Sequence, residues 1–222
     1  MQMMPRSAPA SSAIVRVGPK ALGGELVVPI DSVGLVVFAH GSGSSRFSPR
    51  NRWVASMLQR QHLATLLFDL LDENEAADRS FVFDAPMLAH RVVQALDWVR
   101  QRNDLAGLQI GLFGASTGAA AALIAAAARP AAVGATVSRG GRPDLAHDAL
   151  EQVQAPTLLI VGGDDAEVLA LNRSAYRRLN CKKRLEVVPR ARHLFEEPGA
   201  LDAVASLAAD WFENHLGTGS SN

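Results

Sequence analysis

The stretch around Ser116 places the strongest constraint on how this chain can fold. Residues 114–118 read Gly-Ala-Ser-Thr-Gly; an apolar run, residues 108–113, precedes them, and residues 119–128, eight of them alanine, follow. This order predicts a buried strand, a sharp turn with a serine at its apex, and a helix. We expect small residues at 114 and 118, because bulk there would collide with the neighbouring strand or with the first turn of the helix.

The glycines of this turn allow a second interpretation. Glycine-rich turns before alanine-rich helices also occur in dinucleotide-binding units. Here Gly111, Gly114 and Gly118 follow the spacing G-x-x-G-x-x-x-G instead of G-x-G-x-x-G, and no acidic residue about twenty positions later closes a second strand. The pentapeptide therefore favours a nucleophilic serine over a packing turn, and the rest of the chain must decide.

The remaining sequence alternates apolar runs with amphipathic stretches. This alternation predicts an α/β fold: one domain with a mostly parallel twisted sheet of about eight strands and helices on both faces. The strands are expected at residues 14–17, 25–28, 33–39, 63–68, 108–113, 133–137, 157–161 and 184–188. We expect the domain over residues 13–216 and flexible tails over 1–12 and 217–222. Residues 69–84 are expected to form a mobile acidic segment, and the sequence does not decide whether this segment acts as a lid.

Composition excludes several classes of protein. Lys plus Arg and Asp plus Glu both number 22, so the formal net charge is zero and neither nucleic acid nor a membrane is expected as a partner. No apolar run reaches eighteen residues, and the N-terminus does not resemble a signal peptide. The single cysteine, Cys181, cannot form an internal disulfide. We expect a cytoplasmic protein, either a monomer or a homodimer.

Polar residues follow the expected strands at the edge of the sheet where such folds bind ligands. A serine nucleophile needs a base to take its proton and a carboxylate to orient that base. The chain supplies Ser116, Asp165 and His193 in this order, each after a strand. Asp164 and Glu167 are alternatives for the acid, and His40 is an alternative for the base, although its glycine-flanked setting favours a role in shaping a loop.

An oxyanion formed by attack of Ser116 on a carbonyl would need two donors. We expect the backbone N–H of Thr117, directly after the nucleophile, and the backbone N–H of Ser42, in the Gly/Ser loop after residues 33–39. The alternative interpretation of residues 40–45 is an ordinary flexible loop. An abrupt Gly/Ser loop directly after a buried strand favours the functional interpretation.

At these residues the chain resembles the α/β-hydrolase superfamily, and within it the dienelactone-hydrolase-like branch. The resemblance extends from about residue 14 to residue 216. Within the branch, the chain is similar to a subgroup of small bacterial hydrolases, some of which are related to domains fused to phosphoribosyltransferases. It rests on residues 35–51 (LVVFAHGSGSSRFSPRN), 111–123 (GLFGASTGAAAAL), 138–146 (SRGGRPDLA), 157–172 (TLLIVGGDDAEVLALN) and 191–201 (ARHLFEEPGAL). It implies Ser116 as nucleophile, Asp165 as acid and His193 as base.

The chain departs from this family pattern in two ways. Dienelactone hydrolases proper use a cysteine nucleophile, whereas this chain has Ser116, so dienelactone itself is a doubtful substrate. The segment after residues 133–137, where many relatives insert a large lid, is brief here. This brevity implies a minimal lid and an open site.

Arginines near the expected site have two interpretations. Arg46 and Arg50 flank the Gly/Ser loop, and Arg139 and Arg142 follow a strand in a glycine-rich turn. Their guanidinium groups would suit a carboxylate or phosphate on a substrate. The alternative is that they pair with acidic residues and hold loops in place; the candidate partners are Asp69, Asp72, Asp84 and Glu196.

Together these observations predict a serine hydrolase that acts on a small carboxylic ester, thioester or lactone. Its expected partner is a small-molecule acyl substrate, and no cofactor and no metal are implied. The alternative is a non-catalytic binding or regulatory module that keeps the hydrolase shell and acts as a partner of a nucleotide-metabolising enzyme. A peptidase is a third possibility, which the brief lid region disfavours.

Overall fold

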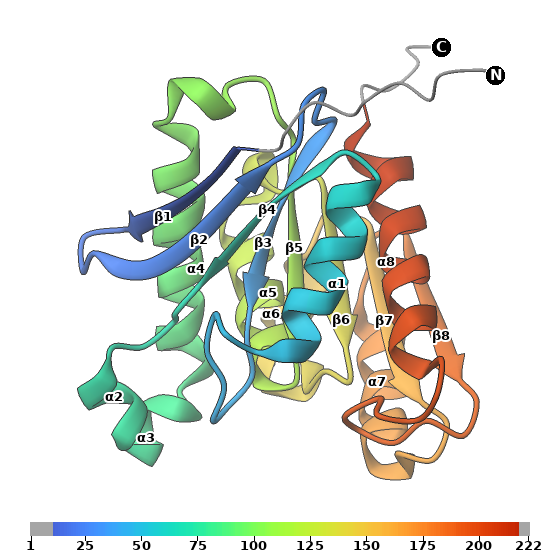
Figure 1. Cartoon of the computed structure of the whole chain (residues 1–222). Helices are drawn as coiled ribbons and strands as arrows, with labels where there is room; N and C mark the ends of the chain where they lie inside the picture. Colours follow the sequence, from blue (N-terminus) through green and yellow to red (C-terminus); the bar gives the residue numbers. More distant parts are fainter. Residues whose placement is uncertain (1–10, 218–222) are drawn as a thin grey trace, which may run out of the picture.

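A computed structural model describes residues 11–217 and shows a twisted eight-stranded sheet between two layers of helices (Figure 1). The strand order is β1-β2-β4-β3-β5-β6-β7-β8. β2 is antiparallel to both β1 and β4, and every other neighbouring pair is parallel. The strands are β1 (Ser11–Val17), β2 (Leu22–Val28), β3 (Gly34–Ala39), β4 (Leu63–Phe68), β5 (Ile110–Ala115), β6 (Ala135–Arg139), β7 (Thr157–Gly162) and β8 (Lys183–Val188). The expected α/β fold is confirmed.

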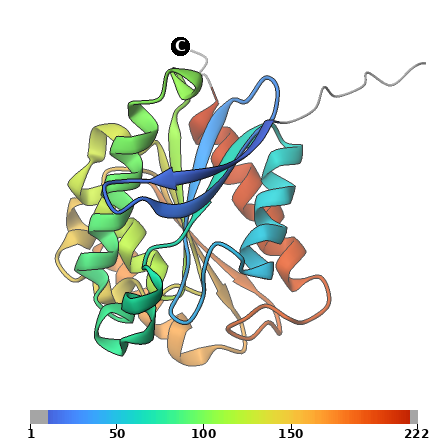
Figure 2. The same ribbon diagram turned by 60° about the vertical axis from the view of Figure 1, so that its left-hand side comes forward.

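The helices cover both faces of this sheet (Figure 2). α1 (Pro49–Arg60) and α8 (Ala200–Leu216) pack on one face, while α4 (Ala85–Arg100) and α5 (Thr117–Ala128) pack on the other. The remaining helices are α2 (Glu73–Ala77), α3 (Arg79–Val82), α6 (Ala149–Gln152) and α7 (Ala166–Arg178), with 3-10 turns at Asn103–Leu105, Pro130–Ala132 and Pro143–Ala146. Each face has its own apolar core, so the sheet is buried on both sides.

The central strands and α5 lie deepest in the molecule. All six residues of β3, β4, β5 and β7 are buried, which is why these strands read as continuous apolar runs without alternation. α5 is apolar around its circumference because it lies between the sheet and α4. Its alanines let the helix approach both neighbours closely, and this fixes the position of its N-terminal turn.

The structure corrects two expectations about the chain outside the central strands. β1 begins at Ser11, and Ser11 and Ser12 pair with Val28 and Val27, so the expected tail to residue 12 ends two residues too late. Gly217, assigned to the other tail, is the C-cap of α8. The rest of both expected tails, residues 1–10 and 218–222, lies outside the described residues.

The acidic segment over residues 69–84 is not an irregular loop. It contains α2 and α3, which begin after the N-cap residues Asp72 and Asp78. The Asp72 side chain accepts from the N–H of Glu75, and the Glu75 side chain accepts from the N–H of Asp72, forming a capping box. The segment is therefore ordered by its own acidic side chains. No helix within residues 11–217 has the length and apolar character needed to cross a membrane.

Candidate active site

Ser116 occupies a strained turn between β5 and α5. Its φ is +51°, a left-handed conformation that non-glycine residues rarely adopt. A Cβ on Gly114 would lie 2.4 Å from the Ala119 Cα, and a Cβ on Gly118 would lie 2.2 Å from the Ala39 carbonyl oxygen. The predicted need for small residues is confirmed, since these contacts are with the first turn of the helix and the neighbouring strand.

The turn after β6 holds this serine through the backbone. The N–H of Ser116 donates to the carbonyl of Arg139 at 3.2 Å, and the N–H of Arg142 donates to the carbonyl of Ser116 at 3.0 Å. The turn is itself held by Asn172, a fully buried residue of α7 whose Nδ2 donates to the Gly141 carbonyl at 2.9 Å. Sequence analysis missed Asn172, because no local pattern marks a helical asparagine as a partner of a turn 31 residues away.

Three side chains predicted to act together form one hydrogen-bonded chain. His193 Nδ1 lies 2.8 Å from Asp165 Oδ2, and His193 Nε2 lies 3.3 Å from Ser116 Oγ. A carboxylate can only accept, so Nδ1 carries the proton and Nε2 is left to accept from the Ser116 hydroxyl. The arrangement can therefore draw the proton from Ser116 towards His193.

Asp165 is the acid that reaches His193 among the acidic residues of this stretch. It occupies the N-cap position of α7, yet its side chain makes no capping hydrogen bond, so the carboxylate is available to the imidazole. The neighbouring Asp164 contributes a backbone N–H to the Ala191 carbonyl at 2.9 Å. That bond ties the loop carrying the acid to the loop carrying His193.

The loop after β3 lies beside Ser116, with its expected donor already engaged. A Cβ on Gly41 would lie 3.0 Å from the Ser116 Cβ, so glycine permits this close approach. The N–H of Ser42 donates to Thr117 Oγ1 at 2.9 Å. Thr117 begins α5, where the first N–H groups have no acceptor within the helix. Thus both expected oxyanion donors lie next to the nucleophile, but that of Ser42 is bound to a side chain.

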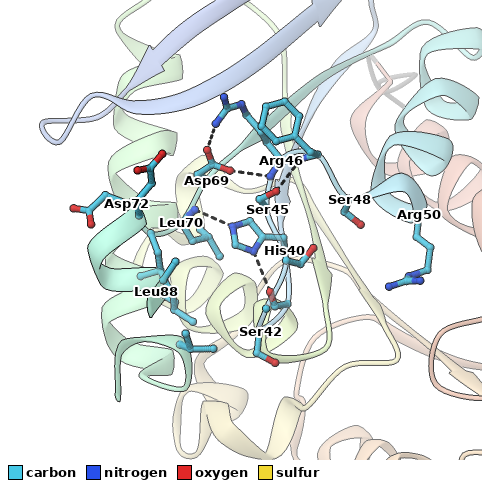
Figure 3. Close-up of a pocket in the computed structure, with 18 of the residues that line it drawn as sticks. His40, Ser42, Ser45, Arg46, Ser48, Arg50, Asp69, Leu70, Asp72 and Leu88 are labelled. Carbon is cyan, nitrogen blue, oxygen red and sulfur yellow. Dashed lines mark hydrogen bonds and ion pairs between the residues drawn. The ribbon is translucent and has the colours of Figure 1, made fainter. Parts of the chain in front are cut away.

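His40 shapes this loop and lies apart from the Ser116–His193 pair. Its Nδ1 donates to the Gly41 carbonyl at 3.0 Å, and its Nε2 accepts from the Leu70 N–H at 3.0 Å (Figure 3). Burial lowers the pKa of His40, so the ring is neutral, as a ring that donates at one nitrogen and accepts at the other must be. His40 thereby joins the loop after β3 to the segment after β4.

Two cavities border the loop after β3. The smaller, about 210 Å³, contains Ser116 and His193 and is also lined by Arg139 and Leu194. The larger, about 710 Å³, lies between this loop and the α2–α3 segment (Figure 3). They share five lining residues: Gly41, Ser42, Ser44, Ser48 and Arg50. Ser116 therefore faces a small chamber that adjoins a larger one.

Three of the four arginines expected near the site have different surroundings. Arg46 pairs with Asp69, one of the expected partners, and Arg142 pairs with Asp144 at 2.8 Å. Arg139 is 7% exposed and lines the smaller cavity, and its guanidinium has no hydrogen-bond or ion-pair partner within residues 11–217. Burial and the nearby charge of Arg50 lower the pKa of Arg139 to about 10.

Arg50, which flanks the Gly/Ser loop as expected, borders both cavities. Its Nη1 lies 3.2 Å from Oε1 of Glu196, one of the expected partners. No cluster of three or more His, Cys, Asp or Glu side chains in the described part of the chain could hold a metal ion.

Comparison with known proteins places this geometry in a family. Residues 54–217 match the model of the dienelactone hydrolase family. The crystal structure of dienelactone hydrolase from Anabaena variabilis is 54% identical and superposes with a TM-score of 0.90, covering 95% of this chain and 100% of that one. Carboxyl esterase 2 from Tuber melanosporum has the same fold at 18% identity, with a TM-score of 0.74, over 96% of this chain and 89% of that one.

Two curated relatives from Mycobacterium tuberculosis, strains CDC 1551 and H37Rv, are 56% identical over 199 residues, and their names describe a phosphoribosyl transferase. The match covers 90% of this chain and 45% of each relative, so the chain spans less than half of their length. The family model, the sequence identity to the Anabaena variabilis structure and the fold agree. The chain belongs to the dienelactone hydrolase family and has its α/β-hydrolase fold.

Proposed function

We propose that this protein hydrolyses a small carboxylic ester, thioester or lactone through an acyl-enzyme on Ser116. The hydrogen-bonded chain from Ser116 through His193 to Asp165 is the observation that supports this proposal most strongly. The strained backbone of Ser116 adds to it, because a left-handed serine between a strand and a helix presents its hydroxyl to the cavity.

The reaction has two halves. His193 Nε2 takes the proton of the Ser116 hydroxyl as Oγ attacks the substrate carbonyl, and then delivers that proton to the leaving oxygen or sulfur. In the second half, His193 takes a proton from water as the water oxygen attacks the acyl carbonyl. His193 then returns that proton to Ser116 Oγ as the bond between Oγ and the acyl carbon breaks, which releases the acid and restores the serine. Asp165 keeps the imidazole in the required tautomer and stabilises its cation in both halves.

The oxyanion of each tetrahedral intermediate would be bound by the N–H groups of Thr117 and Ser42. The Ser42 N–H serves this purpose once the Thr117 hydroxyl, its acceptor in the resting structure, is displaced by the more strongly accepting oxyanion. Until then the hydroxyl satisfies a donor that would otherwise be without a partner.

Replacement of Ser116 by alanine tests this mechanism. Ser116→Ala should lower kcat for p-nitrophenyl butyrate by about 10⁴-fold or more and abolish labelling by a fluorophosphonate probe, because no other group can form the acyl-enzyme. Asp165→Asn should lower kcat by a similar order, while Asp164→Asn is the matched control that leaves it near wild type.

Undiminished turnover by Ser116→Ala would overturn the mechanism. The wild-type protein distinguishes the proposed enzyme from a non-catalytic module. Failure of the wild type to react with any activated ester or with the fluorophosphonate would favour a binding module in a hydrolase shell.

A further inference from the structure

Asn51 is a buried polar residue of α1 that lines the same chamber as Ser116. We infer that its side-chain amide binds a hydroxyl group on the acyl part of the substrate, a few bonds from the reacting carbonyl. This inference deepens the proposed function and rests on it. It names a substrate class, the esters of short hydroxy acids.

Asn51 lies where α1 otherwise presents apolar side chains to the sheet. The buried residues of this helix are Asn51, Val54, Ala55 and Leu58, and their spacing of three and four places them on one face. The last three belong to the apolar core on that side of the sheet, whereas Asn51 lies at the end of the stripe that reaches the chamber. A polar side chain in such a stripe lowers stability unless its amide finds hydrogen-bond partners.

The capping of α1 does not supply such a partner. Ser48 is the N-cap, and its hydroxyl oxygen accepts from the Asn51 N–H at 3.3 Å. In a capping box the Asn51 side chain would accept from the Ser48 N–H in return, but that N–H donates to the Ser45 carbonyl at 3.0 Å. Asn51 is 3% exposed, and its Oδ1 is buried without a hydrogen-bond partner within residues 11–217. The local structure of the helix therefore does not account for the amide.

The polar groups at this end of the chamber are complementary to a hydroxyl group. Asn51 Oδ1 needs a partner that donates, which a carboxylate or an ester oxygen cannot do. The Ser48 hydroxyl, which also lines the chamber, accepts through its oxygen and keeps its proton to donate. A substrate hydroxyl can donate to Asn51 and accept from Ser48, whereas an ammonium group has no lone pair to accept with. Figure 3 shows Ser48 apart from Asp69 and Asp72, the carboxylates labelled in the larger cavity.

The size of the chamber limits the distance between the hydroxyl and the carbonyl. Its volume of about 210 Å³ equals that of about seven water molecules, and its lining includes both Ser116 and Asn51. A hydroxybutyryl group, with its hydroxyl on the second or third carbon, has these dimensions. The larger cavity shares five lining residues with the chamber and leaves room for the alcohol part of the ester.

The test compares p-nitrophenyl butyrate with the p-nitrophenyl esters of 2-hydroxybutyrate and 3-hydroxybutyrate, each hydroxy ester as separate enantiomers. All are uncharged and release the same alcohol, so the ratio of kcat/KM between a hydroxy ester and the butyrate reports on the hydroxyl. The wild type should prefer at least one hydroxy ester. Asn51→Leu should lower that ratio by about 3- to 12-fold, the range for one neutral hydrogen bond, and change kcat/KM for the butyrate by less than about twofold.

Further variants separate the amide from its surroundings. Asn51→Asp keeps an acceptor of the same size and should retain most of the preference. Asn51→Ala adds no bulk and should lower the ratio as the leucine variant does, which decides the question if the leucine variant does not fold. Asn172→Leu is the matched control, because this buried amide donates to the carbonyls of Gly141 and Val168. It should lower kcat/KM for all the esters alike and leave the ratio unchanged.

A purely structural role for Asn51 would give a different result. Asn51→Leu would then lower the melting temperature and reduce kcat/KM for every ester equally, whereas removal of an unpartnered buried amide should not destabilise the protein. An unchanged ratio in the Asn51 variants, or a wild type without a preference for any hydroxy ester, overturns the inference. Butyrate hydrolysis and fluorophosphonate labelling report on the proposed function separately, so the inference can fail while the serine mechanism stands.

Discussion

On one side of Ser116, the turn after β6 is held by backbone hydrogen bonds, whereas on the other side α2 is held by ion pairs between side chains. The Ser116 N–H bonds to the last residue of β6, and the Ser116 carbonyl bonds to Arg142 in that turn. α2 is tied to the β1–β2 turn by Lys20, which bonds to Asp72 and Glu75 at 2.6 Å each. Backbone bonds in a buried site leave little freedom, while exposed ion pairs contribute little energy. The Ser116 turn is therefore held rigidly, and the wall of the larger cavity is easier to change.

Of the substitutions considered, Gly118→Ala should disrupt the Ser116 turn most severely. The added Cβ would lie 2.2 Å from the Ala39 carbonyl oxygen and 2.4 Å from that of His40, and neither backbone atom can move without shifting β3. We expect a loss of about 3 kcal/mol in the free energy of unfolding, together with loss of fluorophosphonate labelling. Urea denaturation and the labelling rate measure the two effects.

Gly107→Ala is the matched control for that substitution. Gly107 has a φ of +87° and open space around its Cβ position, so alanine there incurs backbone strain alone. The expected cost is about 1 kcal/mol with normal labelling. If Gly118→Ala lowered the free energy of unfolding and the labelling rate no more than this control, close packing would not be what holds the turn in place.

Asn172→Leu should weaken the turn after β6, which holds Ser116, by a smaller amount. The amide donates to the Gly141 carbonyl, and its replacement leaves that buried acceptor unpaired, at a cost of about 1–2 kcal/mol. Because Gly141 belongs to the turn that holds Ser116, kcat should fall severalfold while KM changes little. Asn180→Leu, which removes an exposed amide bond to the Glu151 carbonyl, should change neither quantity. A fall in stability with unchanged kcat would show that the turn does not position the serine.

The same contrast explains what sequence could predict. The turn at Ser116, its glycines and the order of Ser116, Asp165 and His193 are local or sequential signals. Each of the three residues follows a strand whose end lies at one edge of the sheet. The capping box of α2 was also readable, since Asp72 and Glu75 have the D-x-x-E spacing. The acidity of residues 69–84 instead suggested a mobile segment.

The sequence offered candidate acidic partners for the arginines, but it could not predict which arginine would be paired. Arg46, Arg139 and Arg142 are alike in sequence, and what separates them is whether the fold brings a carboxylate to each guanidinium. Arg46 meets Asp69, which is 23 residues away, and Arg139 meets none within the described residues. The engagement of the Ser42 N–H by Thr117 depends in the same way on packing of β3 against α5.

Glu75→Gln should weaken the attachment of α2 with little effect on the stability of the whole protein. Glu75 accepts from Lys20 at 2.6 Å and from Arg91 at 3.0 Å, and loss of its charge should cost about 1 kcal/mol or less. Because α2 borders the larger cavity, KM for esters with a bulky alcohol should change while kcat for p-nitrophenyl acetate stays constant. A large fall in kcat for the acetate would contradict the division between the two sides.

Acid should release α2 before it disturbs the nucleophile turn. The hydrogen bond from Lys20 lowers the pKa of Asp72 below its ordinary value of 3.8. Burial opposes the same shift at Glu75, but the hydrogen bonds from Lys20 and the Asp72 N–H and the charge of Arg91 outweigh it, so the pKa of Glu75 is lowered as well. Both carboxylates therefore stabilise the folded state above their unfolded pKa values, and this contribution is lost as the pH falls through the folded ones.

The pKa of Lys20 is raised above 10.5 by its bonds to Asp72 and Glu75, so its contribution disappears only in strong alkali. Hydrogen exchange by mass spectrometry, corrected for the intrinsic rate at each pH, should show loss of protection in residues 73–82 as the pH falls from about 6 to about 3. Residues 117–128 should stay protected over that range. Lys20→Met should expose residues 73–82 already at neutral pH. If both segments lost protection together, α2 would unfold only with the whole domain, and the two sides of the site would be equally fixed.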